Sequence, residues 1–187
     1  GRIATLRQSQ ARRTRRRDLA RHGNGLITMT NEDFTGLLDR FCGAASRGDG
    51  EAFARCFTED GVYHDYIYGP HTGRAAIADM LVNLFHRDAT NYDWRMFDPV
   101  CDGDIGYAWS LSKFVSTIPE FEGKDVVIDG MSRFVLKDGL IAEYFESVNG
   151  GVAMVQLGVA APRIEKVLRR WAGWLRDRPA VKKYLKD

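Results

Sequence analysis

Two kinds of hydrophobic pattern follow one another along this chain, and their order restricts the fold more than any other feature of the sequence. Between residues 31 and 86, most apolar residues recur at helical spacing, with one strand-like segment at residues 62–68. Between residues 91 and 149, segments rich in β-forming residues alternate with turn residues instead. Helices followed by a run of hairpin-connected strands are typical of α+β proteins, in which helices cover one face of an antiparallel sheet.

The helical part divides into separate segments. The first has Thr30 or Asn31 as its cap and one apolar face, formed by Phe34, Leu37, Leu38, Phe41, Cys42 and Ala45. The glycines around Asp49 end this helix, and a short second helix follows over about residues 52–57. We then expect a turn at residues 59–61, a strand that ends at Gly69-Pro70, and a third helix over residues 75–86.

The second half predicts strands at about residues 91–101, 104–118, 125–137 and 140–149, with Asp-Gly hairpin signals at Gly103 and Gly139. A last amphipathic helix spans about residues 162–176 and has Pro162 in its first turn. The predicted fold is α+β: a cone-shaped, curved antiparallel sheet with helices packed on its concave face, plus a C-terminal helix. Such a fold tends to leave a pocket, because the helices do not fill the whole concavity.

Charge divides the chain near Met29. The formal net charge of +2 combines +7 on residues 1–29, which hold eight arginines and one acid, with −5 on the remainder. We therefore expect a basic arm at residues 1–28 that is not part of the fold, a cone domain at residues 29–160, and a C-terminal helical extension at residues 161–187. The arm could contact nucleic acid or a membrane surface, could be an Arg-rich targeting peptide, or could lie upstream of a natural start at Met29.

Composition argues against several classes of function. An acidic body disfavours nucleic-acid binding except through the arm, and no apolar stretch approaches the ~18–20 residues that span a bilayer. The arm lacks the apolar centre of a secretory signal peptide. Three cysteines, an odd number with no close pair along the sequence, form neither a disulfide framework nor a zinc site, and they favour a cytoplasmic location. The histidines match no metal-binding spacing, so we expect no metal.

Three separated segments resemble a known superfamily. They begin at Phe57 (FTEDGVYHD), at Gly73 (GRAAI) and at Asp138 (DGLIAEYFE), and in order and spacing they are similar to the nuclear transport factor 2-like superfamily. The resemblance covers about residues 31–159 and is closest to the SnoaL-like polyketide cyclase, limonene-epoxide hydrolase and ketosteroid isomerase branches. It implies a cone-shaped fold, but it specifies activity poorly, since this superfamily includes enzymes, binding modules and scaffolds.

The functional residues of these branches carry over only in part. The resemblance places Tyr63 and Asp65 where epoxide hydrolases hold the attacking water, and Glu146 where they have a catalytic carboxylate. Their Arg-x-Asp pair has no counterpart, because the corresponding strand offers only Lys113. Against ketosteroid isomerases, Asp65 occupies the position of the base, but Phe41 replaces a tyrosine of the first helix. Ser132 lies near the position of their protonated aspartate, so neither activity transfers intact.

Asp65, Tyr63 and Glu146 are the candidate catalytic residues. By strand alternation Asp65 and Tyr63 share one face, and burial beside an apolar pocket would poise Asp65 as a general base. Asp65 could instead pair with Arg74, Glu146 could form a surface ion pair with Arg95 or Arg133, and Tyr63 could simply pack in the core. Candidate ligand-contacting residues are Phe41, Trp109, Ser132 and Tyr144.

The expected function is that of a small SnoaL-like enzyme of the isomerase, cyclase or hydrolase type. It would act by acid–base chemistry, without a cofactor, on an apolar cyclic or polyketide-like molecule. A non-catalytic ligand-binding or interaction module of the same fold is the alternative, favoured by the missing Arg-x-Asp pair. An exposed sheet face, together with the habit of the family, suggests a homodimer.

Overall fold

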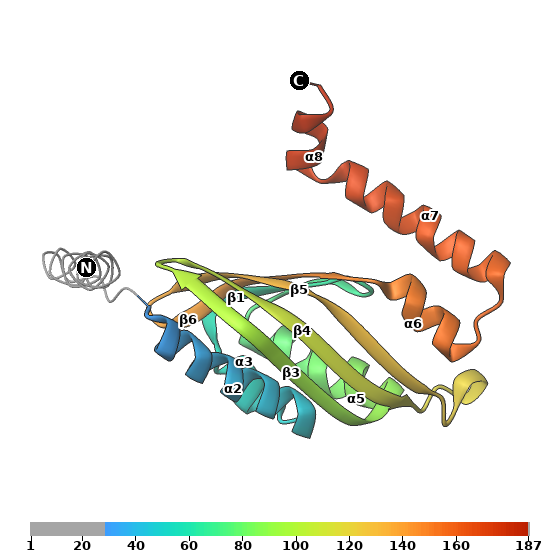
Figure 1. Ribbon diagram of the computed structural model, residues 1–187, viewed down its shortest axis with the longest axis horizontal. Helices are drawn as coiled ribbons and strands as arrows, with labels where there is room; N and C mark the ends of the chain where they lie inside the picture. Colours follow the sequence, from blue (N-terminus) through green and yellow to red (C-terminus); the bar gives the residue numbers. More distant parts are fainter. Residues whose placement is uncertain (1–28, 187) are drawn as a thin grey trace, which may run out of the picture.

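The computed structural model describes residues 29–186 and is centred on a six-stranded sheet in the order β2-β1-β6-β5-β4-β3 (Figure 1). The strands are β1 (Phe57–Asp65), β2 (Gly69–Thr72), β3 (Ala89–Asp102), β4 (Ile105–Ser116), β5 (Asp125–Lys137) and β6 (Leu140–Val148). Neighbouring strands are antiparallel except β1 and β6, which run parallel. The predicted α+β class with a curved sheet is confirmed, and the β1–β6 pair is the parallel exception within it.

The N-terminal helices α2 (Asn31–Arg47) and α3 (Gly50–Ala54) lie on one side of the sheet (Figure 1). Thr30 caps α2, since its hydroxyl accepts a hydrogen bond from the Asp33 N–H at 3.1 Å. The third predicted helix is continuous in extent but changes its winding, because α4 (Arg74–Met80) passes into a π-helical turn at Leu81–Phe85 and then α5 (His86–Asp88). A single 3-10 turn, Pro119–Phe121, follows β4.

The C-terminal part consists of α6 (Gly150–Leu157), α7 (Ala161–Asp177) and α8 (Pro179–Tyr184). In Figure 1, α7 runs away from the end of α6, on the side of the sheet opposite α2. The last predicted helix corresponds to α7. The sequence did not predict α6, whose glycine-rich start gives a weak helical signal.

The predicted turn at residues 59–61 is wrong, because these residues lie inside β1. The pairing of β1 with β6 shifts register between Phe57 and Val62, so β1 bulges there rather than ending. A Cβ on Gly61 would lie 3.1 Å from the carbonyl oxygen of Ile141, which explains a glycine at this close approach. Gly69-Pro70 also does not simply end a strand, because it opens β2 at the sheet edge, where proline is tolerated.

Aromatic side chains form the centre of the core between α2 and the sheet. Phe41 is fully buried and its ring centroid lies 4.6 Å from that of Phe53, 5.2 Å from Trp94 and 5.3 Å from Tyr144. Phe134 of β5 stacks edge-on against Phe34 at 5.2 Å. This packing fixes the orientation of β1 and β6, the strands that carry the predicted catalytic residues.

The structure bears on the expected absence of a membrane-spanning helix but not on the expected division of the chain into an arm, a domain and an extension. No helix within residues 29–186 is long and apolar enough to cross a membrane. The basic arm at residues 1–28 lies outside the described residues, and the division of the remainder at residue 160 stays a prediction.

Candidate functional site

A pocket of about 360 Å³ lies between the sheet and the helices. Its volume falls near the lower end of the range of small-molecule sites, about 300–1,000 Å³. Its lining is mostly apolar and aromatic, with contributions from β1, β3, β4, β5, β6, the π-helical turn and the C-terminal helices. Tyr63, Asp65 and Glu146, the three predicted catalytic residues, all line it.

The parallel pairing of β1 and β6 brings these residues together. Tyr63 is the Cα partner of Tyr144, and Asp65 and Glu146 each follow two positions later on the same face of their strands. Adjacent strands are about 4.8 Å apart. The two carboxyl groups are therefore neighbours at the ends of β1 and β6, although 81 positions separate them in the sequence.

Asp65 is held by the backbone that follows it. The residue is only 8% exposed, and its carboxylate accepts a hydrogen bond from the Ile67 N–H at 2.7 Å and another from the Tyr68 N–H. Burial raises the pKa of Asp65, and these two N–H donors oppose that rise by stabilising the charged form. Arg74, the alternative partner, instead donates to the carbonyl oxygen of Phe57 at 2.8 Å.

Glu146 is the more strongly perturbed of the two carboxyl groups. Burial, followed by the negative charge of Asp65, raises the pKa of Glu146 to about 8. Its carboxylate accepts a hydrogen bond from the Tyr144 hydroxyl at 3.2 Å. Neither predicted alternative partner is engaged with it, because Arg95 pairs with Asp93 and Arg133 lies over the ring of Phe145. A pKa of about 8 favours the protonated form of Glu146 at neutral pH.

Tyr63 contributes a buried hydroxyl between the core and the pocket. Its ring is fully buried and its centroid lies 4.6 Å from that of Tyr144. Burial and the nearby charge of Glu146 raise the pKa of Tyr63 well above its ordinary value, so the phenol keeps its proton. Within residues 29–186 this hydroxyl makes no close hydrogen bond, although it lies near enough to Glu146 to lower the pKa of that carboxyl group, so it places a donor beside the carboxyl pair.

The predicted ligand-contacting residues lie elsewhere. Trp109 was expected to wall a ligand, but its side chain is 40% exposed and packs against Phe97 rather than lining the pocket. Phe41 is fully buried in the aromatic core and does not line the pocket either. Ser132 and Tyr144 form a buried hydrogen bond of 2.9 Å with each other, and neither residue lines the pocket. Strand alternation explains why Trp109 does not line the pocket: Ser110 and Ser112 lie on the face of β4 that lines it, and Trp109 lies on the opposite face.

Several pocket residues were not predicted. The alternating series Ser110, Ser112, Phe114 and Ser116 of β4 lines one wall, and its period of two was visible in the sequence. The Ser110 hydroxyl accepts a hydrogen bond from the Trp94 indole at 2.9 Å. Trp171 of α7 also lines the pocket, and no local signal in the sequence indicates that contact.

The described residues, 29–186, contain no cluster of three or more histidine, cysteine or acidic side chains placed to hold a metal ion. The polar groups of the pocket, Asp65, Glu146 and Tyr63, are proton donors and acceptors. Two neighbouring carboxyl groups beside a neutral phenol, one of them with its pKa raised to about 8, can accept a proton from a bound molecule and return one to it.

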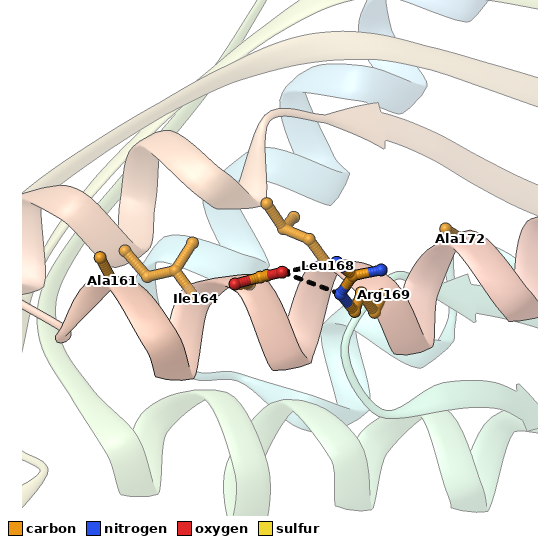
Figure 2. A pocket seen from close by; sticks show the side chains of 6 residues that line it. Ala161, Ile164, Leu168, Arg169 and Ala172 are labelled. Atoms are coloured by element: carbon orange, nitrogen blue, oxygen red, sulfur yellow. Dashed lines mark hydrogen bonds and ion pairs between the residues drawn. The ribbon is translucent and has the colours of Figure 1, made fainter.

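A second, shallow depression lies on α7 (Figure 2). It is lined by one helix alone, with Ile164 and Leu168 beside Arg169, whose guanidinium pairs with Glu165 at 2.6 Å. It contains no convergent polar groups from other elements, so the pocket against the sheet is the candidate site.

Solved structures with the same fold include an epoxide hydrolase and proteins described as putative polyketide cyclases. TsrD from Streptomyces laurentii is 16% identical, with a TM-score of 0.62 over 71% of this chain and 99% of that chain. A putative polyketide cyclase from Xanthomonas campestris pv. campestris is 24% identical, with a TM-score of 0.57 over 68% of this chain and 98% of that chain. An LEH-like epoxide hydrolase of M. tuberculosis is 13% identical, with a TM-score of 0.56 over 68% of this chain and 90% of that chain.

These identities establish the fold and leave the reaction open. No curated protein matches the sequence significantly. The sequence model of the SnoaL-like domain matches residues 38–144, more than half of the chain, and that segment contains Tyr63 and Asp65. With this match and the shared fold, the chain belongs to the SnoaL-like domain family, in the nuclear transport factor 2-like superfamily.

Proposed function

We propose that this protein is a small acid–base enzyme that acts on an apolar, oxygen-containing small molecule in the pocket. The observation that carries the proposal is the pair of neighbouring carboxyl groups, Asp65 and Glu146, which line one pocket and differ in their partners: two backbone N–H groups hold Asp65, whereas Glu146 has a pKa raised to about 8. Asp65, stabilised as a carboxylate by two backbone N–H groups, is the base. Glu146 is the acid, and Tyr63 donates to the oxygen of the substrate. The reaction is of the isomerase, cyclase or hydrolase type and needs no cofactor, since proton transfer suffices.

Two simple probes test this proposal. α-Tetralone, an apolar bicyclic ketone, exchanges its α-protons with D₂O when a base removes them, and NMR follows the exchange. Cyclohexene oxide reports addition of water. We expect catalysis of at least one reaction, and a loss on the order of 10²–10⁴-fold when the base is removed in Asp65→Asn.

A matched control separates chemistry from folding. Glu143 lies on the same strand as Glu146 but on the outer face, where it pairs with His64 at 3.1 Å. Glu143→Gln should keep full activity, whereas Glu146→Gln should lose the acid step. Unchanged turnover in both Asp65→Asn and Glu146→Gln would remove the proposed assignment.

The second candidate function is ligand binding without catalysis. Lys113, which stands in the region where epoxide hydrolases require their Arg-x-Asp pair, forms an ion pair with Asp93 at 3.6 Å and does not line the pocket. A positive charge beside the carboxyl pair is therefore missing from that strand. Binding of both probes with no exchange and no hydrolysis would favour this candidate.

A homodimer and a cytoplasmic location belong to the same proposal. Tyr107, Trp109 and Met131 are 40–51% exposed on the outer face of the sheet, and Trp109 and Met131 are Cα partners on neighbouring strands. Such a contiguous apolar surface favours burial against a second copy. The thiols of Cys42 and Cys56 are free and buried, which is consistent with a reducing compartment.

A further inference from the structure

Helix α7 lies outside the matched segment at residues 38–144, and it contributes four residues to the lining of the candidate site: Arg163, Val167, Arg170 and Trp171. Trp171 is 8% exposed and lines the pocket. Its ring lies edge-on to Tyr66, with centroids 4.9 Å apart, and Tyr66 directly follows Asp65. Trp171 also touches Gly150, just beyond the end of β6. The indole therefore covers the ends of the two strands that carry Asp65 and Glu146.

The close contact with Gly150 fixes the position of the Trp171 indole. A Cβ at Gly150 would lie 2.7 Å from Cη2 and Cζ3 of the Trp171 ring, closer than nonbonded carbons approach. These atoms belong to the six-membered ring, so the edge that carries Nε1 is turned away from Gly150. The absence of a side chain at this one position lets the indole reach the strand ends.

The indole N–H of Trp171 has no hydrogen-bond partner within residues 29–186, although it is buried. Two other donors of the pocket wall are satisfied: the Trp94 indole donates to Ser110 at 2.9 Å, and the Tyr68 hydroxyl donates to Asp88 at 2.9 Å. In the described part of the chain, the Tyr63 hydroxyl is a second fully buried donor of the pocket that makes no close hydrogen bond, and it lies beside Glu146. A buried donor left unpaired is unfavourable, so such groups in a pocket indicate a ligand that accepts from them.

We propose that Trp171 is a substrate-binding residue, and that its indole N–H donates a hydrogen bond to an oxygen atom of the ligand. Tyr63 lies on β1 and Trp171 reaches the pocket from α7, so the two donors approach from different elements and fit an apolar molecule that carries acceptor oxygen. Helix α7 thereby becomes part of the site. This inference rests on the proposed function in that it uses the same pocket, but it concerns binding rather than turnover.

The test compares α-tetralone with tetralin, a hydrocarbon of nearly the same shape that has no acceptor oxygen. In ¹H–¹⁵N spectra of the full chain, the indole signal that is missing from Trp171→Phe identifies Trp171. We expect α-tetralone to move this signal downfield and tetralin to leave it near its free position. The preference for the ketone should fall about 2- to 10-fold in Trp171→Phe, the effect of one hydrogen bond.

Trp174→Phe is the matched control, because Trp174 lies on the same helix, is 47% exposed and does not line the pocket. It should leave the preference for the ketone unchanged. An unmoved Trp171 signal, an equal preference in Trp171→Phe, or binding of neither probe overturns the inference. Ketone-selective binding without proton exchange supports Trp171 as a binding residue, while the proposed catalysis fails. If proton exchange occurs and persists unaltered in Trp171→Phe, the proposed catalysis stands and the role of Trp171 fails.

Discussion

Replacement of Glu146 by glutamine tests the electrostatics of the site without requiring a substrate. Glutamine has nearly the shape of a protonated glutamate and can still accept the hydrogen bond from Tyr144, but it cannot ionise. The pKa of Glu146 is raised from its ordinary value of 4.5 to about 8 by burial and by the charge of Asp65. The variant therefore isolates the effect of one ionisation on the free energy of unfolding.

The sign follows from proton linkage. A carboxyl group with a raised pKa binds its proton more tightly in the folded chain than in the unfolded chain. The resulting stabilisation is complete below the unfolded pKa of about 4.5 and is lost as the pH rises through the folded pKa of about 8. At about 1.4 kcal/mol per pH unit, the loss is at most roughly 5 kcal/mol. Water that enters the pocket solvates this half-buried side chain and reduces the loss.

The assay is urea unfolding, followed by tryptophan fluorescence, at several pH values between about 5 and 9. The wild-type protein should lose stability steadily as the pH rises, by several kcal/mol in total. Glu146→Gln should lose much less, so the variant becomes the more stable protein at the alkaline end. Part of the slope should remain, because the pKa of Asp65 is also raised by burial.

Glu122→Gln provides the control, since Glu122 is exposed in the connection between β4 and β5. This variant should follow the wild-type pH dependence. A wild-type stability that does not change between pH 5 and 9, or an equal slope in Glu146→Gln, would show that Glu146 is solvated and would refute the reasoning.

Three further changes test other parts of the structure. Gly150→Ala places a methyl group 2.7 Å from the ring of Trp171 and should destabilise the protein by roughly 1–3 kcal/mol in urea, whereas Gly151→Ala, which meets no atom closer than 3.4 Å, should cost much less. Burial raises the pKa of Cys42 to about 12, so this thiol should stay unmodified by a disulfide reagent at pH 8 until the protein is unfolded, and rapid native labelling would contradict this. Trp109→Lys should convert a dimer to a monomer in sedimentation velocity, and a wild-type monomer would end the dimer proposal.

Local patterns were sufficient for most of the elements. The capping of α2 by Thr30 and the hairpin at Gly139 depend on residues close in sequence, and both were predicted. The bulge in β1 and the edge strand β2 were missed, because their polar and glycine residues have the local composition of turns. Their extended conformation is stabilised by hydrogen bonds to strands elsewhere, and such pairing leaves no signal in a short window.

The same distinction applies to the site. Strand alternation placed Asp65 and Tyr63 on one face, and the resemblance to the superfamily selected Glu146. Alternation also shows why Trp109 was a wrong choice for a pocket wall: it points outward, between the inward-facing Ala108 and Ser110 of the same strand. Trp171 could not have been found, because its contact with the pocket depends on the path of the chain after α6 and on the small size of Gly150.

The sequence by itself determined the α+β class and the order of most elements, because hydrophobic periodicity and turn residues act over a few positions, and its resemblance to the superfamily selected the candidate carboxyl groups. Only the tertiary structure decided that Asp65 and Glu146 are neighbours, that burial and the charge of Asp65 raise the pKa of Glu146, and that α7 lines the same pocket. Parallel pairing of β1 with β6 and burial are long-range effects, and the pKa of a carboxyl group depends on what surrounds it in space rather than along the chain.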